Sequence, residues 1–292
     1  RIESRGLGDV YKRQFLGVDP QLLDEIQQGG HQAVPTKDVE ASAGQERFEW
    51  IEAIQSELLS LQQNSAYHPA SHQERQDIKS GALKIIPGSL LATLKAPEKG
   101  KRRKKARVVG CGNHQSKAED LGQRLDTQQV DATSLRMLLR WAAGHNHALG
   151  AIDIKTAFLN AALPEDMKIA VRPPKILSRM GLIDPEELWV LDRALYGLRV
   201  SPRQWQHERD SALRKMTWTV NGAARRLVQS SLDPALWCII DPEKTTNGYA
   251  IESIDITDPS TEIFGLIGTY VDDIMGASGG AELEAFFSAI RL

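Results

Sequence analysis

Two short apolar runs flank an acidic tetrapeptide late in the sequence. Ile263–Thr269 precedes Tyr270-Val271-Asp272-Asp273, and Ile274–Ala277 follows it. Apolar runs on either side of a short polar turn are typical of a β-hairpin, so the sequence predicts one here. A further carboxylate, Asp153, lies in the apolar strand predicted over Ala148–Ile154. Carboxylates at buried strand ends are costly unless they are paired or bind a metal ion, so these acids require a partner.

The rest of the sequence predicts helices and strands that do not alternate regularly. Apolar residues at helical spacing predict helices over Phe48–Leu61, from an N-cap at Thr133, from Pro202 to about Met216, and from Ala281 onward. Strands are predicted at Leu90–Leu94, Ala106–Cys111, Met167–Val171, Leu188–Leu191 and Ala235–Ile240. This order favours an α+β fold over a doubly wound parallel sheet.

Two stretches show no sustained pattern. Residues 1–47 are polar and glycine-rich, and we expect a poorly ordered lead, of which 1–14 resemble translated adapter sequence. Asp241–Glu262 is polar and rich in turn-forming residues, which predicts a surface insertion. The folded domain is therefore expected over residues 48–292.

Composition excludes several classes of protein. Hydrophobic residues make up 41% of the 292 residues and charged residues 25%, which is typical of a globular chain with a real core. No run of about 18 apolar residues occurs, so no membrane span is predicted. Two cysteines, Cys111 and Cys238, cannot build a disulfide framework or a four-ligand zinc site.

Positive charge is concentrated in one segment. Residues 95–107 hold eight basic residues and one acidic residue, a net charge of +7 in a chain whose net charge is −2. Such a block suggests contact with a polyanion, and a solvated flexible loop is the alternative.

The carboxylates also allow two interpretations. Asp153, Asp272 and Asp273, brought together from two strands, would suit a pair of Mg²⁺ ions about 3.5–4 Å apart, which is an arrangement for in-line phosphoryl transfer. Alternatively, Asp272-Asp273 is an ordinary hairpin turn, because Asp is common in turns.

Four blocks in order resemble the reverse transcriptase of copia-type long-terminal-repeat retrotransposons. They are a fingers strand over 105–115, a first catalytic motif at Asp153-Ile154-Lys155-Thr156-Ala157-Phe158-Leu159-Asn160-Ala161, a template-grip motif over 194–205, and a second catalytic motif at Tyr270-Val271-Asp272-Asp273. Trp50 and Glu57 also resemble positions in the first helix of that family. The resemblance covers about residues 48–292.

The resemblance implies a right-hand polymerase core of fingers and palm, with an antiparallel palm sheet packed on helices and the thumb largely absent. The implied activity is RNA-directed DNA polymerase, with two Mg²⁺ ions, or Mn²⁺ instead, and nucleotidyl transfer to a primer 3′-hydroxyl. The implied partners are an RNA or DNA template with its primer, deoxynucleoside triphosphates, and the integrase and RNase H of the full polyprotein, with no membrane. The implied location is the cytoplasm, in the virus-like particle of the element, or the nucleus.

The same resemblance assigns individual residues. Asp153, Asp272 and Asp273 would be the catalytic metal ligands, and the Ile154 carbonyl would complete one metal shell. The nucleotide-binding residues would be Lys105, Arg107, Phe158, Gly197 and Arg199. The template-primer backbone would contact Lys101, Arg102, Arg103 and Lys104. Phe158 would exclude a 2′-hydroxyl, the group that distinguishes RNA from DNA, and an ordinary core phenylalanine is the alternative.

Three other functions remain open at this point. The first is a non-catalytic nucleic-acid-binding remnant of a retroelement polyprotein. The second is another metal-dependent phosphoryl-transfer enzyme, such as a nuclease. The third is an unstable fragment of element sequence without a function of its own.

Overall fold

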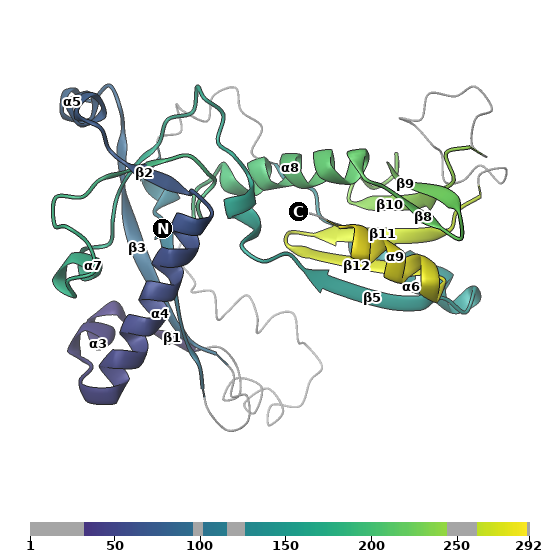
Figure 1. Cartoon of the computed structure of the whole chain (residues 1–292), viewed down its shortest axis with the longest axis horizontal. Helices are drawn as coiled ribbons and strands as arrows, with labels where there is room; N and C mark the ends of the chain where they lie inside the picture. Colours follow the sequence, from purple (N-terminus) through teal and green to yellow (C-terminus); the bar gives the residue numbers. More distant parts are fainter. Residues whose placement is uncertain (1–31, 96–101, 116–125, 244–261, 291–292) are drawn as a thin grey trace, which may run out of the picture. The chain divides into compact units, whose positions relative to one another are not determined.

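A computed structural model of the chain describes residues 32–95, 102–115, 126–243 and 262–290 (Figure 1). The chain divides into two compact units. The first comprises the described parts of Arg1–Ser60, Ser89–Val108 and Pro174–Pro185, and the second comprises those of Leu61–Gly88, Val109–Pro173 and Glu186–Leu292. Helices and strands mix in both units, so the predicted α+β class is confirmed.

The second unit contains an antiparallel sheet of six strands in the order β5-β12-β11-β10-β9-β8. Its strands are β5 (Ala148–Asp153), β8 (Thr217–Val220), β9 (Ala223–Gln229), β10 (Leu236–Ile240), β11 (Gly265–Tyr270) and β12 (Asp273–Ser278). Strands β11 and β12 form the predicted hairpin, with Thr269 opposite Ile274. Strand β5 then pairs antiparallel with the outer edge of β12.

Helices cover both faces of this sheet. Helices α8 (Ser201–Lys215) and α9 (Gly280–Ala289) pack on one face, where Trp205, Trp237 and Phe286 share a buried cluster. Helix α6 (Ala132–Gly144) packs on the other face, where Leu138 joins a second buried cluster. Successive residues of a strand point to opposite faces, so Trp237 belongs to the first cluster and Cys238 to the second. Both faces are buried, which explains why β10 is apolar at every position.

A second group of strands has the order β1-β3-β6-β7-β2, with β4 also paired to β3. Their bounds are β1 (Gln32–Val34), β2 (Tyr67–Pro69), β3 (Ile85–Leu94), β4 (Lys104–Gly110), β6 (Ala170–Arg172) and β7 (Trp189–Leu191). The pair β3–β6 is parallel, whereas β1–β3, β6–β7 and β2–β7 are antiparallel.

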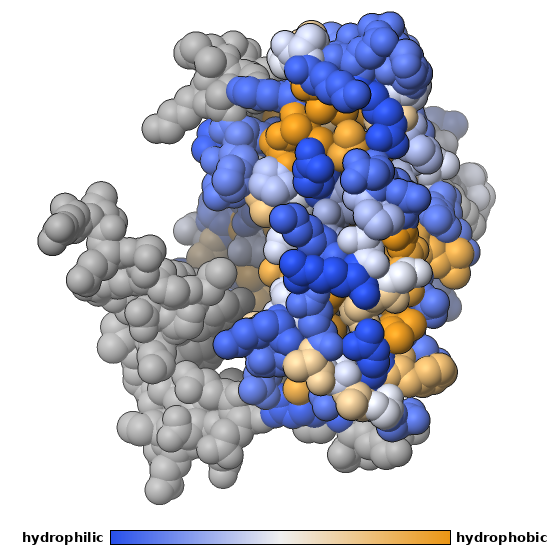
Figure 2. Space-filling model, turned by 90° about the vertical axis from the view of Figure 1, so that its left-hand side faces the viewer, coloured by the Kyte–Doolittle hydropathy of each residue, from blue (hydrophilic) through white to orange (hydrophobic). Residues whose placement is uncertain are grey.

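The remaining helices are shorter, apart from α4. They are α3 (Thr36–Ala41), α4 (Gly44–Gln63), α5 (His72–Ser80) and α7 (Lys175–Arg179), with the 3₁₀ turns η1 (Gly112–His114) and η2 (Ala157–Asn160). None of the helices in the described ranges combines the length and the hydropathy that a bilayer-spanning segment requires. The face drawn in Figure 2 is mainly hydrophilic, with apolar residues gathered in separate patches.

Several expectations from the sequence need correction. Residues 32–47 are not a poorly ordered lead, since they form β1, α3 and the start of α4. The apolar stripe predicted on α4 is confirmed at Ile54, Leu58 and Leu61, but Phe48 is exposed and Trp50 is buried. The N-cap of α6 is Asp131 rather than Thr133, because the Asp131 carboxylate accepts from the backbone N–H groups of Thr133 and Ser134. The stretches 1–31 and 244–261, which hold the adapter-like residues and most of the predicted insertion, lie outside the described residues.

Candidate active site

The structure places two of the three predicted carboxylates directly opposite each other. Asp153 is the last residue of β5, Asp273 is the first residue of β12, and the two are register partners. Directly opposed residues on antiparallel strands have Cβ atoms about 4.5–5.5 Å apart and point to the same face. Because Ile152 and Ile274 face α8 and α9, the two carboxylates lie on the face that α6 covers farther along the sheet.

The third carboxylate, Asp272, lies in the turn between β11 and β12. The backbone N–H of Ile154 donates to the Asp272 carbonyl oxygen over 2.8 Å, so the end of β5 is tied to this turn. Val271 has a φ of 52°, in the left-handed region. A two-residue hairpin loop favours this conformation at its first position, but it costs a residue with a Cβ roughly 1–2 kcal/mol, which contacts outside the turn can offset.

Helix α8 supplies those contacts from the opposite face of the sheet. The indole Nε1 of Trp205 donates to the Val271 carbonyl oxygen over 2.7 Å, and the Arg209 Nη1 donates to the same oxygen over 3.4 Å. Arg209 is itself ion-paired with Asp210 over 2.8 Å, and both side chains are buried. Sequence reasoning did not connect Trp205 or Arg209 with this turn, because no local pattern links a helix to a turn more than 60 residues later.

The carboxylates are more accessible than the sequence predicted. Asp153 and Asp273 are exposed and Asp272 is half-buried, so they lie at strand ends that reach solvent rather than in an apolar interior. The pKa of Asp273 is nevertheless raised, first by partial desolvation and then by the negative charges of Asp272 and Asp153. The charges of Asp272 and Asp153 therefore reach Asp273, and a cation would relieve that repulsion.

The donor set suits Mg²⁺ in chemistry but is not a complete protein cage. Carboxylate oxygens are the ligands that this hard cation prefers, and Mg²⁺ is often held by one or two carboxylates together with substrate phosphates. Within the described ranges, no group of three or more His, Cys, Asp and Glu side chains is arranged to enclose a metal ion. Asp153, Asp272 and Asp273 are therefore not arranged as a three-carboxylate metal site, and a cation bound there would need oxygen ligands from a substrate as well.

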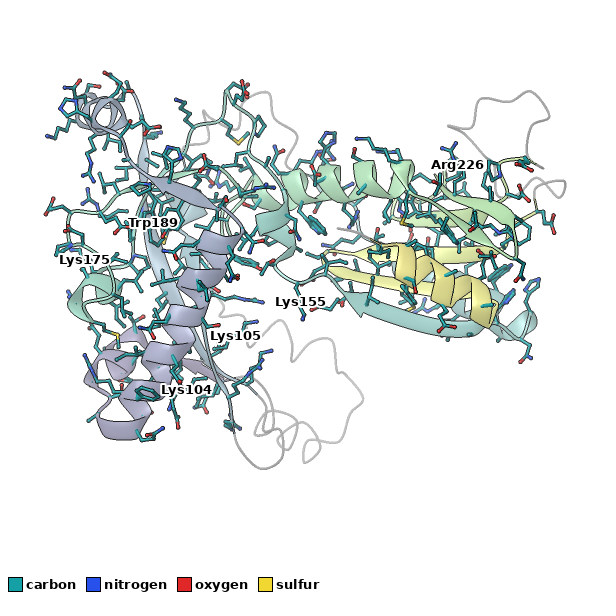
Figure 3. The ribbon with its side chains drawn as sticks, viewed as in Figure 1. Lys104, Lys105, Lys155, Lys175, Trp189 and Arg226 are labelled. Carbon is teal, nitrogen blue, oxygen red and sulfur yellow. The ribbon has the colours of Figure 1, made fainter. Side chains whose placement is uncertain are left out.

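Phe158 lies a short distance along the chain from Asp153, on η2. Its ring is half-buried against the cluster beneath α8 and meets the Tyr196 ring edge-on, with the centroids 5.2 Å apart. The chain turns sharply after β5, because Thr156 adopts a left-handed φ of 53°. Lys155 is exposed at this end of β5, where Figure 3 labels it, and sequence reasoning gave it no role.

Gly197 occupies a position that requires glycine. Its φ is +84°, and a Cβ there would overlap the carbonyl oxygen of Gly110. The close approach is fixed by backbone hydrogen bonds, from Gly110 N–H to the Tyr196 oxygen (2.7 Å) and from Gly112 N–H to the Gly197 oxygen (3.2 Å). The fingers-strand block and the template-grip block, more than 80 residues apart in sequence, are therefore in backbone contact.

Gln115 is a residue of this junction that sequence reasoning did not single out. Its buried side-chain oxygen accepts from the Arg199 backbone N–H over 3.0 Å. It also lines a cavity of about 640 Å³ in the second unit, together with Val200, Lys84 and Lys168. Gln115 thus fixes the backbone at Arg199, and the Arg199 side chain is half-buried.

Lys105 and Arg107 project from one face of β4, since they are two residues apart on a strand. They belong to the first unit, whereas the three carboxylates belong to the second. The pKa of Lys105 is lowered by burial and by the positive charges of Arg107, Lys95 and Arg103. Positive charge is therefore crowded on this strand, which favours binding of an anion.

The Glu57 carboxylate supports the same strand from α4. It accepts from the Val108 backbone N–H over 3.0 Å, and burial raises its pKa against the opposing effects of that hydrogen bond, Arg107 and Lys105.

The residues predicted to contact a nucleic-acid backbone lie in different surroundings. Lys104 is ion-paired with Glu49 over 2.7 Å and lies over the Trp50 ring at 5.4 Å, so it holds β4 to α4 (Figure 3). The structure therefore gives Lys104 an internal role in place of a free phosphate contact. Arg102 lies within 3.4 Å of the Gln32 side chain and Arg103 is exposed, whereas Lys101 lies outside the described residues.

Comparison with known protein families shows a match over about half of the chain. Residues 79–228, about half of the chain, match the family model described as reverse transcriptase (RNA-dependent DNA polymerase). The matched range includes Asp153, Phe158 and the block over 194–205, and it ends before Asp272.

Curated relatives agree with this match. The chain is 29% identical over 173 residues to the retrovirus-related Pol polyprotein from transposon TNT 1-94 of Nicotiana tabacum, covering 59% of this chain and 12% of that protein. It is 32% identical over 109 residues to the corresponding polyprotein from transposon RE1 of Arabidopsis thaliana, covering 36% of this chain and 7% of that protein. The chain thus matches about an eighth or less of the length of these relatives. It belongs to the reverse transcriptase (RNA-dependent DNA polymerase) family, in the form found in copia-type retrotransposon polyproteins.

Proposed function

We propose that this chain is the fingers and palm of an RNA-directed DNA polymerase that extends a primer by two-metal nucleotidyl transfer. The palm would be the sheet β5-β12-β11-β10-β9-β8 with its helices, and the fingers would include β3, β4 and α4. The observation that supports this most strongly is the register pair of Asp153 and Asp273, with Asp272 in the adjoining turn. These carboxylates come from two strands about 120 residues apart, and their mutual repulsion favours a divalent cation.

Asp153, Asp272 and Asp273 would hold two Mg²⁺ ions, and Mn²⁺ could replace them. When bound, such ions lower the pKa of a hydroxyl nucleophile and neutralise the charge of a triphosphate and its pyrophosphate leaving group. The Ile154 backbone remains fixed to the turn through its N–H, which keeps the carboxylates of both strands in register. A carbonyl ligand from Ile154 is part of the same proposal.

The incoming nucleotide would be bound by basic and aromatic side chains. Lys105 and Arg107 crowd positive charge on β4 and would bind the triphosphate, while Arg102 and Arg103 would contact the template-primer backbone. Gly197, held against Gly110, would let the backbone approach a nucleotide or template closely. Phe158, half-buried with its edge to Tyr196, would lie against the sugar and exclude a 2′-hydroxyl.

Primer extension tests the activity. The chain, a primed RNA template, deoxynucleoside triphosphates and Mg²⁺ should give extended primer, and Asp153→Asn or Asp272→Asn should abolish it. Asp166→Asn, which alters an exposed carboxylate in a loop, is the matched control and should leave extension unchanged. Equal extension by Asp272→Asn and the unaltered chain would overturn the proposed role of the carboxylates.

The same assay separates the proposal from its alternatives. Template binding without extension would support the non-catalytic remnant. Loss of nucleic acid in the absence of nucleotides would support a nuclease. The proposed contact of Phe158 with the sugar is tested by Phe158→Val, which should allow ribonucleotides to be incorporated. Tyr196→Phe keeps the neighbouring ring, so it should still exclude ribonucleotides. Unchanged ribonucleotide exclusion in Phe158→Val would contradict the assignment.

A further inference from the structure

We propose that Trp205 and Arg209 are positioning residues that set the divalent-cation affinity of the carboxylate site. They would act by holding the Val271 carbonyl from the reverse face of the sheet. This inference rests on the proposed function, because it concerns the same hairpin. It adds two residues that make no contact with the reacting groups.

The turn that carries Asp272 has a conformation that its own sequence disfavours. Val271 is β-branched and has a φ of 52°, where residues with a Cβ are seldom found. A two-residue hairpin loop favours a positive φ at its first position, which is usually a glycine, so Val271 meets the requirement of the turn only at a steric cost. A change in this conformation would rotate the peptide unit that joins Val271 to Asp272, and the Asp272 carboxylate would move with it.

Two donors converge on the carbonyl oxygen of that peptide unit. The Trp205 indole N–H reaches it over 2.7 Å and the Arg209 guanidinium over 3.4 Å. Both residues are on α8, one turn apart, and each residue is 1% exposed. Hydrogen bonds made by buried donors are costly to lose, because the donor is then left without a partner.

The Arg209 guanidinium is held in place by a buried network. It donates twice to one Asp210 carboxylate oxygen, over 3.0 and 2.8 Å, and the other Asp210 oxygen lies 3.4 Å from the Gln206 amide nitrogen. The Gln206 side-chain oxygen accepts in turn from the Gln128 backbone N–H over 2.8 Å. A buried hydrogen-bond network thus lies behind the turn, while Asp153 and Asp273 are exposed on the opposite face.

This geometry resembles the support of metal sites by residues outside the ligand set. Such residues orient the ligands, and their loss commonly weakens metal affinity by about 10–100-fold. Trp205 and Arg209 would thus fix the direction of the Asp272 carboxylate without touching the cation. Replacing either residue should therefore weaken cation binding while the overall fold stays the same.

Trp205→Phe tests the indole hydrogen bond, because it removes the N–H and keeps most of the aromatic packing. Trp218→Phe is the matched control. Trp218 packs in the same buried cluster and its indole N–H also donates to an oxygen, that of Glu282 over 3.2 Å. It lies on β8, which β9 and β10 separate from the hairpin strand β11. Both variants lose one indole N–H and similar core volume. A general loss of packing would therefore affect them alike.

The primary readout is Mn²⁺ binding, measured by electron paramagnetic resonance on the unaltered chain and each variant. We expect the Mn²⁺ dissociation constant to rise about tenfold in Trp205→Phe and to stay within twofold in Trp218→Phe. The Mg²⁺ concentration for half-maximal primer extension should shift in parallel, with little change in the KM for the nucleotide. Equal Mn²⁺ affinity in the two variants would overturn the inference.

A second variant keeps the test decisive if Trp205→Phe does not fold, as judged by circular dichroism. Arg209→Lys keeps a positive charge beside Asp210 but no longer reaches the Val271 carbonyl. It should therefore weaken Mn²⁺ binding as well. Unchanged Mn²⁺ affinity in this variant would count against the inference. If the unaltered chain neither binds Mn²⁺ nor extends a primer, the proposed function fails instead. If it does both and the variants match it, only the positioning role fails.

Discussion

Asp153 and Asp273 face each other as register partners across β5 and β12, at the end of the sheet where the hairpin turns. Directly opposed like charges destabilise an antiparallel pair, so this arrangement is unfavourable for folding on its own. Helix α8 and the β5–β12 pairing hold the acids together despite that repulsion. A site that concentrates negative charge in this way favours a bound cation.

Mg²⁺ should therefore stabilise the folded chain through these acids. The free energy of unfolding should rise with Mg²⁺ concentration, by about 2.7 kcal/mol at one hundred times the dissociation constant, and EDTA should reverse the gain. In Asp153→Asn the gain should be much smaller. Differential scanning fluorimetry across a Mg²⁺ series measures both, with Asp166→Asn as the control. The same Mg²⁺ response in Asp153→Asn would contradict the assignment of that residue as a ligand.

The Asp273 pKa gives an independent check on the same cluster. It is raised in the folded chain, partly by the charge of Asp153. The folded state therefore holds its proton more tightly than the unfolded state, and stability falls as pH rises through the raised pKa. Asp153→Asn removes one repelling charge and should lower the pKa of Asp273. Carboxyl carbon NMR titration reports this directly, and an unchanged pKa would show that the two groups do not interact.

Replacing Gly197 by alanine should destabilise the second unit strongly. Gly197 has a φ of +84°, and an added Cβ would overlap the Gly110 carbonyl oxygen. The left-handed backbone alone costs an alanine roughly 1–2 kcal/mol, and the overlap adds to this. Gly222→Ala is the control, since Gly222 has a φ of +81° with nothing within 4 Å of an added Cβ. Urea unfolding should show a larger loss for Gly197→Ala, and equal losses would mean that the close approach is absent.

Glu57 should couple pH to the stability of β4. Burial raises its pKa above the ordinary value of 4.5, so the free energy of unfolding should fall as pH rises from about 4.5 through the raised pKa. Glu57→Gln keeps an oxygen acceptor for the Val108 N–H and should remove this pH dependence. Glu57→Ala leaves that buried N–H without a partner, at a cost of about 1–3 kcal/mol. Amide hydrogen exchange at Val108 distinguishes the variants: protection should persist in Glu57→Gln and fall in Glu57→Ala.

Glu74 should make α5 sensitive to acid. The backbone N–H and hydroxyl of Ser71, with His68, lower the pKa of Glu74 to about 2. A depressed carboxyl pKa stabilises the fold above the ordinary value of 4.5, and that contribution is lost as pH falls from about 4.5 to about 2. Glu74→Gln should lose this acid dependence, as monitored by hydrogen exchange in α5. Gln76→Ala changes another exposed position of α5 without adding a titrating group and should retain it.

Local sequence patterns predicted the elements of the candidate site but not their pairing. Clear local signals predicted these elements directly. Apolar runs marked the hairpin of β11 and β12 and strand β5, and a helix-starting proline marked α8. The pairing of Asp153 with Asp273 could not, because it joins strands about 120 residues apart and no local signal encodes that register. The hydrogen bonds from Trp205 and Arg209 to the Val271 carbonyl could not be predicted for the same reason.

The missed elements have identifiable physical causes. Strand β9 contains Arg225, which reads as a surface residue, yet the residue is buried because Glu282 from α9 pairs with it over 3.0 Å and the Phe264 ring lies 3.9 Å away. Helix α5 was missed because none of its residues is buried, so it has no apolar stripe. The Ser71–Glu74 capping box and Gly81 could have predicted where it begins and ends. Lys104 was grouped with its basic neighbours because its partner Glu49 lies 55 residues earlier.

The alternation of side chains along β5 makes the site sensitive to chain length. Deletion of one residue between Gly150 and Asp153 would leave an apolar strand able to pair with β12 through its backbone, but Asp153 would then lie on the face of α8 and α9. Under the proposed function, such a deletion would separate the carboxylate pair while the sheet could still form. Length changes within this strand are therefore expected to damage cation binding more than substitutions elsewhere in the sheet.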